Sequence, residues 1–404
     1  MPLGPFTPQP PPVAMPTARS CPFDPPDELL SFRDQPDPRR LLYPDAHLGW
    51  LVTGYSSARK ILADPRFSAR SELKRVPVSR PGADPFIGRP ALPGWFVDMD
   101  PPDHTRYRRL LAGQFTVRRM KELRPGIERI VEEHLDVMER CGPSADLVAS
   151  FALPVPSLVI CELLGVPYSD RAAFQHNSTV LFSLEASADE AVRAMEALTG
   201  FLVDLVRHKR RLPEDDVLSA LATDSGLGDL EVAGAGVLLL TAGHETVASM
   251  LGLGTFALLS HPAQLEALRG DPELIDDAVE ELLRYLTIFH FGVPRMPLED
   301  VEVDGQVFRG GESVTHSLAT ANRDPRRFEE PDVLDIGRTP LSHLAFGHGV
   351  HQCIGQNLAR LEMRVGYAAL LRRFPRLRLA VPAANVRLAD DAGFYGVHEL
   401  LVTW

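Results

Sequence analysis

Several features that would quickly assign a class are scarce or missing in this sequence. Cysteine occurs four times in 404 residues, at Cys21, Cys141, Cys161 and Cys353, and no two of them form a C-x-x-C pair. A disulfide framework and a cysteine-based zinc site are therefore both disfavoured, and we expect a reducing, cytoplasmic location. The start of the chain lacks the positive charge and apolar core of a signal peptide. Its prolines instead predict a flexible, proline-rich lead over residues 1–20.

Long apolar runs, a dinucleotide-binding loop and a basic face are also missing. The most apolar stretches, around 232–242 and 148–161, are too short or too interrupted by Pro154 and Pro156 to predict a membrane span. No G-x-G-x-x-G loop follows a predicted strand, so no flavin- or dinucleotide-binding unit is indicated. The net charge is −12, and the basic clusters lack interleaved aromatic residues. We therefore expect neither a membrane nor a nucleic-acid partner.

The sequence does contain a mostly helical pattern. Apolar residues recur at helical spacing in many segments, for example over 127–135 and 274–283. Strand signals are few: an Asp-Gly pair between alternating apolar residues at 301–308 predicts a tight hairpin, and 397–402 predicts a further strand. No linker or fixed repeat divides the chain. These patterns predict a mainly α protein with small β sheets, organised as one large domain over 21–404.

One cysteine lies in a glycine-rich loop that leads directly into a helical pattern. The loop runs from Phe346 through Gly347 and Gly349 to Cys353 and Gly355. Glycines let the backbone turn tightly and approach a large flat ligand closely. Backbone N–H groups and the helix dipole stabilise a thiolate at a helix start. The loop therefore indicates an anionic sulfur at the head of a buried helix, although a lone cysteine is more often a structural core residue.

The pattern Phe-x-x-Gly-x-x-x-Cys-x-Gly in this loop resembles the haem-binding loop of the cytochrome P450 family. The resemblance implies the cytochrome P450 fold, with haem b between a distal and a proximal helix. It also implies that Cys353 is the thiolate ligand of the iron, with Phe346, Gly347 and Gly355 beside the haem. The likeness covers most of the chain. It is strongest for soluble bacterial members, in particular an actinobacterial subgroup that acts on macrolides, sterol-like compounds and xenobiotics.

A second motif, Ala242-Gly243-His244-Glu245-Thr246, lies within an apolar helical segment. Glycine and threonine in a helix interior favour a bend or a widened groove. The start of the motif is similar to a zinc HExxH site, but the second histidine position holds alanine here. The segment resembles the family's distal-helix motif. That resemblance implies that Glu245 and Thr246 relay protons and that Ala242 and Gly243 face the haem. The structural alternative is a kinked helix in which the threonine bonds back to a carbonyl.

Glu281 and Arg284 are spaced so that they share one helix face and can form an ion pair. Such pairs are common and weak at exposed surfaces. The segment resembles the family's ExxR helix, which implies a buried pair behind the haem with Arg338 as its third member. We expect these three residues to be structural.

Haem carries two carboxylates, which need cationic partners when they are buried. The resemblance implies four such partners in three segments. His104 and Arg108 are four residues apart on one predicted helix, Arg295 precedes a strand, and His351 lies two residues before the cysteine. For each residue taken alone, a solvated surface position would be the commoner state.

The resemblance implies a monooxygenase that inserts one oxygen atom from O2 into a C–H bond. The positions expected to face the substrate are mostly apolar or aromatic, which predicts a medium or large apolar small molecule, with His290 as a polar anchor. Ordinary core packing is the alternative for most of them. These positions are Val97, Leu239, Phe289, His290, Val293 and Phe394.

Because the chain has no reductase unit of its own, the resemblance implies that a ferredoxin and a ferredoxin reductase supply the electrons to a monomeric enzyme. An acidic ferredoxin requires a local basic face on this acidic chain. The arginines expected there are Arg108, Arg109, Arg118, Arg119, Arg360 and Arg364. Two alternatives are a peroxide-dependent oxygenase and a non-catalytic ligand-binding haem protein, and the Glu245-Thr246 pair disfavours both.

Overall fold

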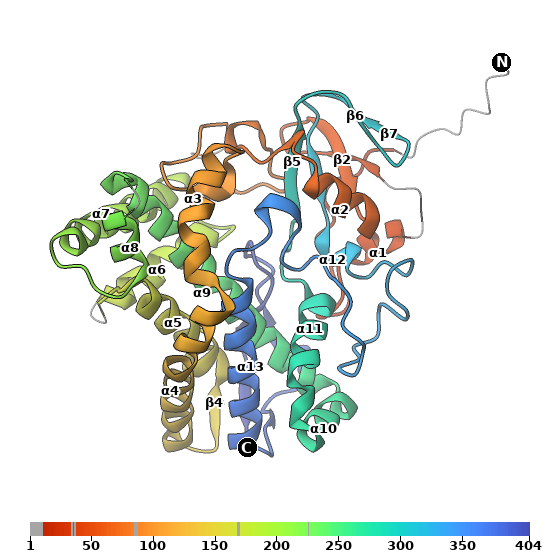
Figure 1. The fold of residues 1–404 in the computed structure, drawn as a ribbon. Coiled ribbons are helices and arrows are strands. Elements are labelled where there is room, and N and C mark those ends of the chain that lie inside the picture. Colours follow the sequence, from red (N-terminus) through yellow and green to blue (C-terminus); the bar gives the residue numbers. More distant parts are fainter. Residues whose placement is uncertain (1–10, 34, 36–37, 85–87, 168–169, 225) are drawn as a thin grey trace.

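The computed structural model describes residues 11–33, 35, 38–84, 88–167, 170–224 and 226–404, and it has the expected mainly α architecture with small sheets (Figure 1). The helices are α1 (Asp27–Arg33), α2 (Tyr55–Ala63), α3 (Asp103–Ala112), α4 (Val117–Cys141), α5 (Pro154–Leu164), α6 (Arg171–Phe182), α7 (Ala188–Arg211), α8 (Val217–Asp224), α9 (Asp229–Ser260), α10 (Pro262–Gly270), α11 (Ile275–Leu286), α12 (Leu318–Ala321) and α13 (Gln356–Arg373). The strands are β1 (Arg39–Leu42), β2 (Leu48–Val52), β3 (Phe67–Ser68), β4 (Ser144–Asp146), β5 (Val293–Pro297), β6 (Val301–Val303), β7 (Gln306–Phe308), β8 (Val314–His316), β9 (Arg378–Leu379), β10 (Arg387–Leu388), β11 (Val397–Glu399) and β12 (Leu401–Thr403).

The largest sheet has the strand order β1-β2-β8-β5-β3 and lies to one side of the helices (Figure 1). Its pairs are antiparallel except β2 with β8, where Trp50 stands opposite Val314. The hairpin predicted at 301–308 is confirmed as β6 and β7, because Asp304 and Gly305 both adopt the positive φ that its tight turn requires. The strand predicted at 397–402 is divided: β11 pairs with β10, whereas β12 pairs with β4 and β9.

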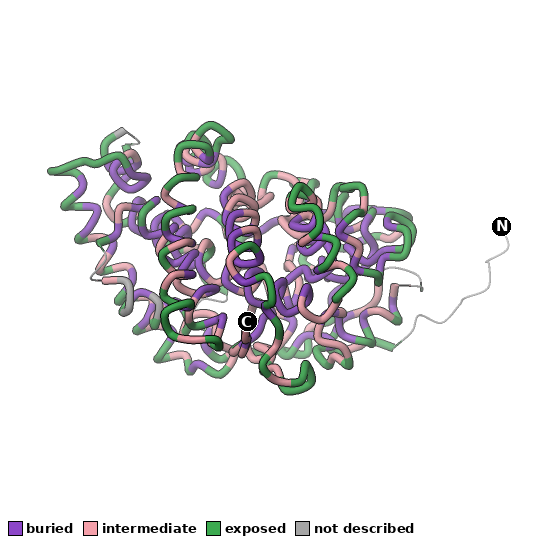
Figure 2. The backbone as a smooth tube through the Cα atoms, turned by 90° about the horizontal axis from the view of Figure 1, so that it is seen from below, coloured by how far each residue is buried: buried purple, intermediate pink, exposed green. Residues whose placement is uncertain are grey.

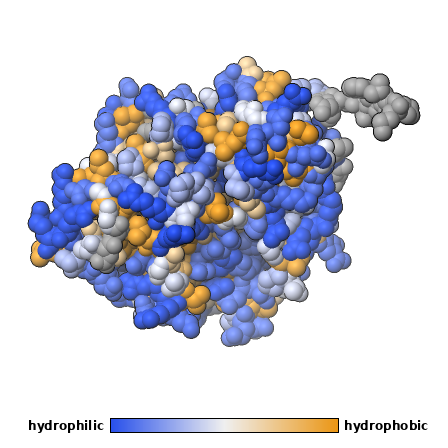
Figure 3. Space-filling view, turned by 45° about the horizontal axis from the view of Figure 1, so that its top comes forward, coloured by the Kyte–Doolittle hydropathy of each residue, from blue (hydrophilic) through white to orange (hydrophobic). Residues whose placement is uncertain are grey.

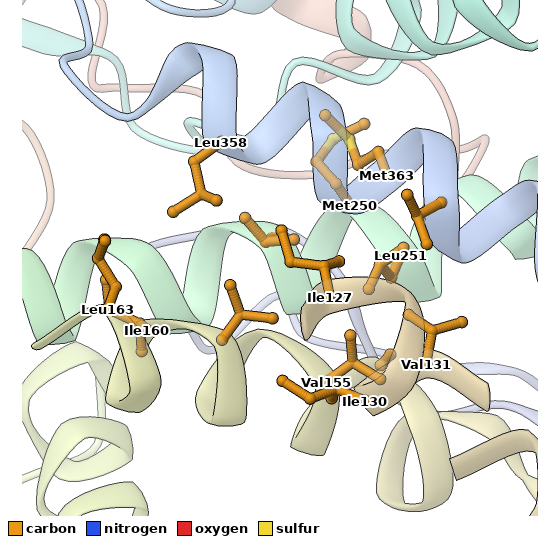
Figure 4. Close-up of a cluster of buried hydrophobic side chains, with 14 of the residues drawn as sticks. Ile127, Ile130, Val131, Val155, Ile160, Leu163, Met250, Leu251, Leu358 and Met363 are labelled. Atoms are coloured by element: carbon orange, nitrogen blue, oxygen red, sulfur yellow. The ribbon is translucent and has the colours of Figure 1, made fainter. Parts of the chain in front are cut away.

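The helical core surrounds α9. Side chains of α4, α5, α9 and α13 meet in one cluster, and Figure 4 shows Ile127, Ile160, Leu251 and Leu358 among them. Buried stretches run through the middle of the molecule when it is viewed from below (Figure 2). A smaller cluster lies around the main sheet and α2. Because α9 packs against several neighbours, it is apolar around most of its circumference, which is typical of a buried central helix.

By length and composition alone, α9 is apolar enough to cross a membrane, which corrects the expectation that the apolar stretch at 232–242 is too short. That stretch continues into a helix of 32 residues, and 72% of its most apolar window is buried inside the fold. Such burial is what a core helix shows. The face drawn in Figure 3 is mostly hydrophilic, with its hydrophobic residues in separate patches.

Residues 11–20 pack against the body, which differs from the lead expected over 1–20. Val13 forms a bridge with Leu41, Met15 is buried, and the Arg19 guanidinium lies 3.9 Å from the centre of the Tyr395 ring. Val13 has a backbone N–H, which the neighbouring prolines lack, and donates it to the carbonyl of Arg40 in β1. This hydrogen bond pairs the extended segment with the main sheet. The packed body therefore begins before residue 21, and residues 1–10 lie outside the described part of the chain.

Candidate active site

A cavity of about 420 Å³ lies between the central helix α9 and the loop that precedes α13. Its lining is mainly apolar and includes most of the site positions predicted from the sequence. These are Val97, His104, Arg108, Leu239, Ala242, Gly243, Thr246, Phe289, Val293, Arg295, Phe346, Gly347, His351, Cys353, Gly355 and Phe394. Glu245 and His290 are outside the lining. The predicted residues come from segments far apart in the sequence, and the fold brings them to one site.

The glycine-rich loop places Cys353 directly before α13, as predicted. The backbone N–H of Cys353 donates to the carbonyl of Phe346 at 2.9 Å, which closes the loop. Gly349 has a φ of 75°, and a Cβ there would lie 2.4 Å from the carbonyl oxygen of Leu62. No larger residue fits this turn without moving α2. Glycine is therefore required by both conformation and space.

Burial raises the pKa of the Cys353 thiol. The backbone N–H groups of Gly355 and Gln356 act in the opposite direction, and so do the charges of Arg108 and Arg360. The thiolate therefore has built-in donors and cations but is desolvated, which is the setting of a sulfur whose remaining stabilisation comes from a metal ion.

On the facing wall, α9 is unbroken from Asp229 to Ser260 and presents Ala242, Gly243 and Thr246 to the cavity. The Thr246 hydroxyl donates to the carbonyl of Ala242 at 2.7 Å, so the side-chain oxygen is held within the wall. A Cβ on Gly243 would lie 3.0 Å from the Ile160 side chain. The glycine therefore also allows α5 to pack closely against α9.

Glu245 points away from the cavity toward α6. Its carboxylate accepts a hydrogen bond from the Thr179 hydroxyl at 3.2 Å. Burial raises the pKa of Glu245, and the bond from Thr179 acts in the opposite direction. His244 is buried beside Phe174, and burial lowers its pKa to about 4.

The four predicted basic side chains lie near one another in the cavity lining, with Lys74 beside them. His104 and Arg108 come from α3, Arg295 from β5, and His351 from the 3₁₀ turn η8 (Gly349–His351). The rings of His104 and His351 are 4.3 Å apart between centroids. Burial lowers the pKa of His351 to about 2, and the charges of Arg295, His104, Lys74 and Arg108 lower it further in the same direction.

Asp98 and Asp100 lie near this basic cluster, but Asp98 pairs with Lys74, and Asp100 accepts hydrogen bonds from Ser68 and Ala69. Neither ring nitrogen of His104 has a hydrogen-bond partner among the described residues. Burial lowers the pKa of Arg295 to about 10, although the charges of Asp98 and Asp100 oppose the shift. Arg108 and Arg295 supply the positive charge here, while the rings of His104 and His351 are neutral because burial lowers their pKa, and two cations in a buried site favour an anionic ligand. Two carboxylates bound here would satisfy the cluster.

The predicted pair of Glu281 and Arg284 is buried. Glu281 accepts two hydrogen bonds from Arg284, both at 2.8 Å, and one from Arg338 at 3.2 Å. Arg284 also donates to the carbonyls of Asn322 and Pro331. The network therefore ties α11 to the long segment that leads into the cysteine loop.

The expectation that His290 is a polar anchor for substrate is not met by its position. Its ring stacks on Phe291 at 4.1 Å and packs against Tyr395, and burial lowers its pKa to about 4. Phe289 instead faces the cavity, where it forms a bridge with Phe394. His290 begins a turn directly after Phe289, and the two neighbouring side chains have different surroundings.

The structure adds residues that sequence reasoning did not single out. Phe182 of α6 lines the cavity and packs against Phe394 at 5.0 Å, and Glu362 of α13 reaches the lining as a buried carboxyl. Glu280 pairs with Arg360 beside the cysteine loop. No local pattern marks these contacts, because each partner comes from a distant segment.

Comparisons with known proteins agree with the site. The family model for cytochrome P450 matches residues 84–380. Over 394 residues the chain is 50% identical to cytochrome P450 105C1 of a Streptomyces species, covering 97% of this chain and 99% of that protein. It is 44% identical to the vitamin D3 dihydroxylase of Streptomyces griseolus, covering 97% of both. The crystal structure of CYP105P1 in complex with filipin I has a TM-score of 0.92 and 45% identity, covering 97% of this chain and 99% of that chain.

The chain therefore belongs to the cytochrome P450 family, and it is a monooxygenase that binds haem b. The residues present fit this cofactor. The Cys353 thiol faces the cavity with backbone N–H donors converging on it, and the basic cluster of His104, Arg108, Arg295 and His351 stands where two carboxylates would be held. Cys353 and the four basic residues of the cluster were all predicted from the sequence.

Proposed function

We propose that this monooxygenase hydroxylates a medium-sized or large apolar small molecule, with O2 as oxidant and a ferredoxin with its reductase as electron source. The observation that carries the proposal is the cavity itself. Cys353 lies on one wall of the cavity and Thr246 of α9 on the facing wall. The apolar space between them is covered by Phe182, Phe289 and Phe394. The vitamin D3 dihydroxylase and the filipin I complex among its relatives support the same substrate class.

When bound, the haem supplies the oxidising chemistry, and the chain's own residues hold it and control access. In the proposal, Cys353 ligates the iron, while His104, Arg108, Arg295 and His351 hold the carboxylates. Arg108 is already fixed by a hydrogen bond to the carbonyl of Gln352. The apolar lining excludes water and orients the substrate by shape, since burial of apolar surface favours the substrate over solvent.

Glu245 and Thr246 would move protons into the cavity. Burial raises the pKa of Glu245, which favours its protonated form, and its side chain is 18% exposed, so the carboxyl can exchange a proton with solvent. Rotation away from Thr179 would bring the carboxyl toward the wall that carries Thr246. The threonine hydroxyl would then pass the proton to the reacting side of the cavity.

The electron donor would dock where the expected basic face retains free charge. Arg360 and Arg364 pair with Glu280 and Asp276, and Arg118 and Arg119 pair with Glu122. Arg109 is exposed and has no ion-pair partner among the described residues. We therefore narrow the proposed docking contact to Arg109, at the end of α3.

The experiment compares turnover of one apolar macrolide or sterol-like compound under two conditions. One reaction contains NADPH, a ferredoxin reductase and a ferredoxin, and the other contains hydrogen peroxide alone. We expect a product with one added oxygen atom in the ferredoxin reaction. Equal product with peroxide alone would establish the peroxide-dependent alternative. A substrate-induced spectral shift without product in either reaction would establish ligand binding without catalysis.

A further inference from the structure

Arg360 was expected on the ferredoxin-docking face, but its guanidinium is directed into the support of the cysteine loop. Its Nε and Nη2 donate to the two carboxylate oxygens of Glu280 at 2.5 and 3.0 Å. Its Nη1 donates to the side-chain oxygen of Gln356 at 3.0 Å. The side chains of Arg360 and Glu280 are 20% and 21% exposed, so both charges are largely removed from solvent. Such a bidentate, partly buried pair is geometrically specific.

Glu280 is fixed from its other side by His343. The Nδ1 of His343 accepts from the backbone N–H of Ala345 at 3.2 Å, which leaves the proton on Nε2, and Nε2 donates to Glu280 at 3.2 Å. Burial would raise the pKa of Glu280, but the hydrogen bonds from His343 and Arg360 outweigh it and lower the pKa to about 2. Glu280 is therefore an anion at neutral pH and holds Arg360 in place.

The held guanidinium lies against the cysteine loop. Its Cζ atom is 4.5 Å from the centre of the Phe346 ring. The carbonyl of Phe346 accepts a hydrogen bond from the backbone N–H of Cys353. Gln356, which accepts a hydrogen bond from Arg360, is the first residue of α13. Arg360 therefore contacts both ends of the segment that carries the sulfur.

We propose that Arg360 is a positioning residue for the Cys353 loop and that Arg360 and Glu280, the latter held by His343, form a balanced charge pair in which loss of either partner shifts the reduction potential of the bound haem. This inference rests on the proposed role of Cys353 as the iron ligand. One-electron reduction, with the electron supplied by the ferredoxin, adds one negative charge to the haem and thiolate. In this step no covalent bond of the protein forms or breaks. The Arg360 cation favours the reduced form, and the Glu280 anion opposes it. In the intact pair the two effects largely cancel.

The two single substitutions should therefore act in opposite directions. Arg360→Gln leaves the Glu280 anion beside the loop and makes the haem harder to reduce. Glu280→Gln leaves the Arg360 cation and makes the haem easier to reduce. At an effective dielectric near 20, a unit charge roughly 12 Å from the charge that develops changes such an equilibrium by roughly tenfold. For one electron, a tenfold change is about 59 mV.

The test is a spectroelectrochemical titration of the substrate-free holoenzyme and its variants. We expect a shift of about 59 mV to lower potential in Arg360→Gln, a similar shift upward in Glu280→Gln, and a value close to wild type in the double variant. Arg360→Lys keeps the charge and should stay near wild type. Arg372→Gln is the matched control, because Arg372 is an exposed, ion-paired arginine on the same helix, and no shift is expected.

Shifts of the same sign in the two single variants would overturn the proposal, because loss of packing alone has no reason to reverse sign. Single variants within twofold of the wild-type equilibrium would overturn it as well. Should Arg360→Gln fail to fold, Glu280→Gln and Arg360→Lys still decide the question. The carbonyl spectrum of the wild-type protein is recorded first. Absence of a thiolate-type band there would reject the ligand assignment and not the charge network.

Discussion

We expect Glu281→Gln to destabilise the holoenzyme more than any exposed substitution of the same type. The carboxylate of Glu281 accepts four hydrogen bonds, from two nitrogens of Arg284, from Arg338 and from the backbone N–H of Asp335. Both members of the pair are 2–3% exposed. Glutamine keeps the shape but loses the charge and turns an NH2 group toward the arginine donors.

The expected magnitude follows from the burial of the pair. Removing one partner of a buried ion pair costs about 3–5 kcal/mol. Arg284 retains its bonds to the carbonyls of Asn322 and Pro331, so we expect the lower value, about 3 kcal/mol. For 404 residues, an unfolding entropy of about 2.1 cal/mol/K per residue gives about 0.85 kcal/mol per degree. The melting temperature should therefore fall by about 4 °C.

The assay is thermal unfolding of the haem-loaded protein, followed by circular dichroism and by the haem absorbance. Glu266→Gln is the control, because Glu266 and Arg269 have the same spacing on α10 but the glutamate side chain is 70% exposed. The control should change the melting temperature by less than about 1 °C, as exposed pairs contribute little. If Glu281→Gln melts within about 1 °C of wild type, the account of α11 as the anchor of the cysteine segment is wrong.

Three further predictions concern the relay, the docking contact and a buried acid. Thr246→Ala should divert electrons into hydrogen peroxide at the expense of product, while Thr246→Ser should keep most coupling; unchanged peroxide release by the alanine variant would remove Thr246 from the relay. Arg109→Glu should slow reduction by ferredoxin severalfold without changing substrate affinity, whereas Arg364→Glu should act less, since Arg364 pairs with Asp276 at 2.9 Å. Equal effects in stopped-flow reduction would contradict that ranking. Burial raises the pKa of Glu362 well above 4.5, so the folded protein retains a proton that the unfolded chain loses as pH rises above that value. Glu362→Gln should therefore raise the melting temperature at pH 8 and have no effect at pH 4, and a gain independent of pH would refute the assignment.

Local features of the site could be predicted because they depend on a few neighbouring residues. The turn at Gly349 and the start of α13 after Cys353 follow from glycine conformations and apolar spacing within one short segment. The hairpin at 301–308 is set by its Asp-Gly turn in the same way. In both cases the backbone conformation is determined by the residues of the turn itself.

Contacts between distant segments could not be predicted in this way. Glu281 with Arg284 and Glu266 with Arg269 have the same spacing, yet the first pair is buried and the second is exposed. The pairing of Glu280 with Arg360 joins residues 80 apart, and no local pattern selects it. The packing of residues 11–20 escaped prediction for the same reason, because the partners of that segment lie in β1 and near the C-terminus. Burial is a property of the assembled fold, which the short motifs do not contain.

The carbon monoxide difference spectrum of the dithionite-reduced protein tests the central claim most directly, when it is recorded beside Cys353→Ser and Cys161→Ser. Cys161 is also buried but lies in α5, so it controls for the loss of a core thiol. The account predicts a strongly red-shifted Soret band in the wild type and in Cys161→Ser, and its loss in Cys353→Ser. A histidine-type band in the wild-type protein, or a red-shifted band that survives in Cys353→Ser, would contradict the assignment of Cys353 as the haem ligand.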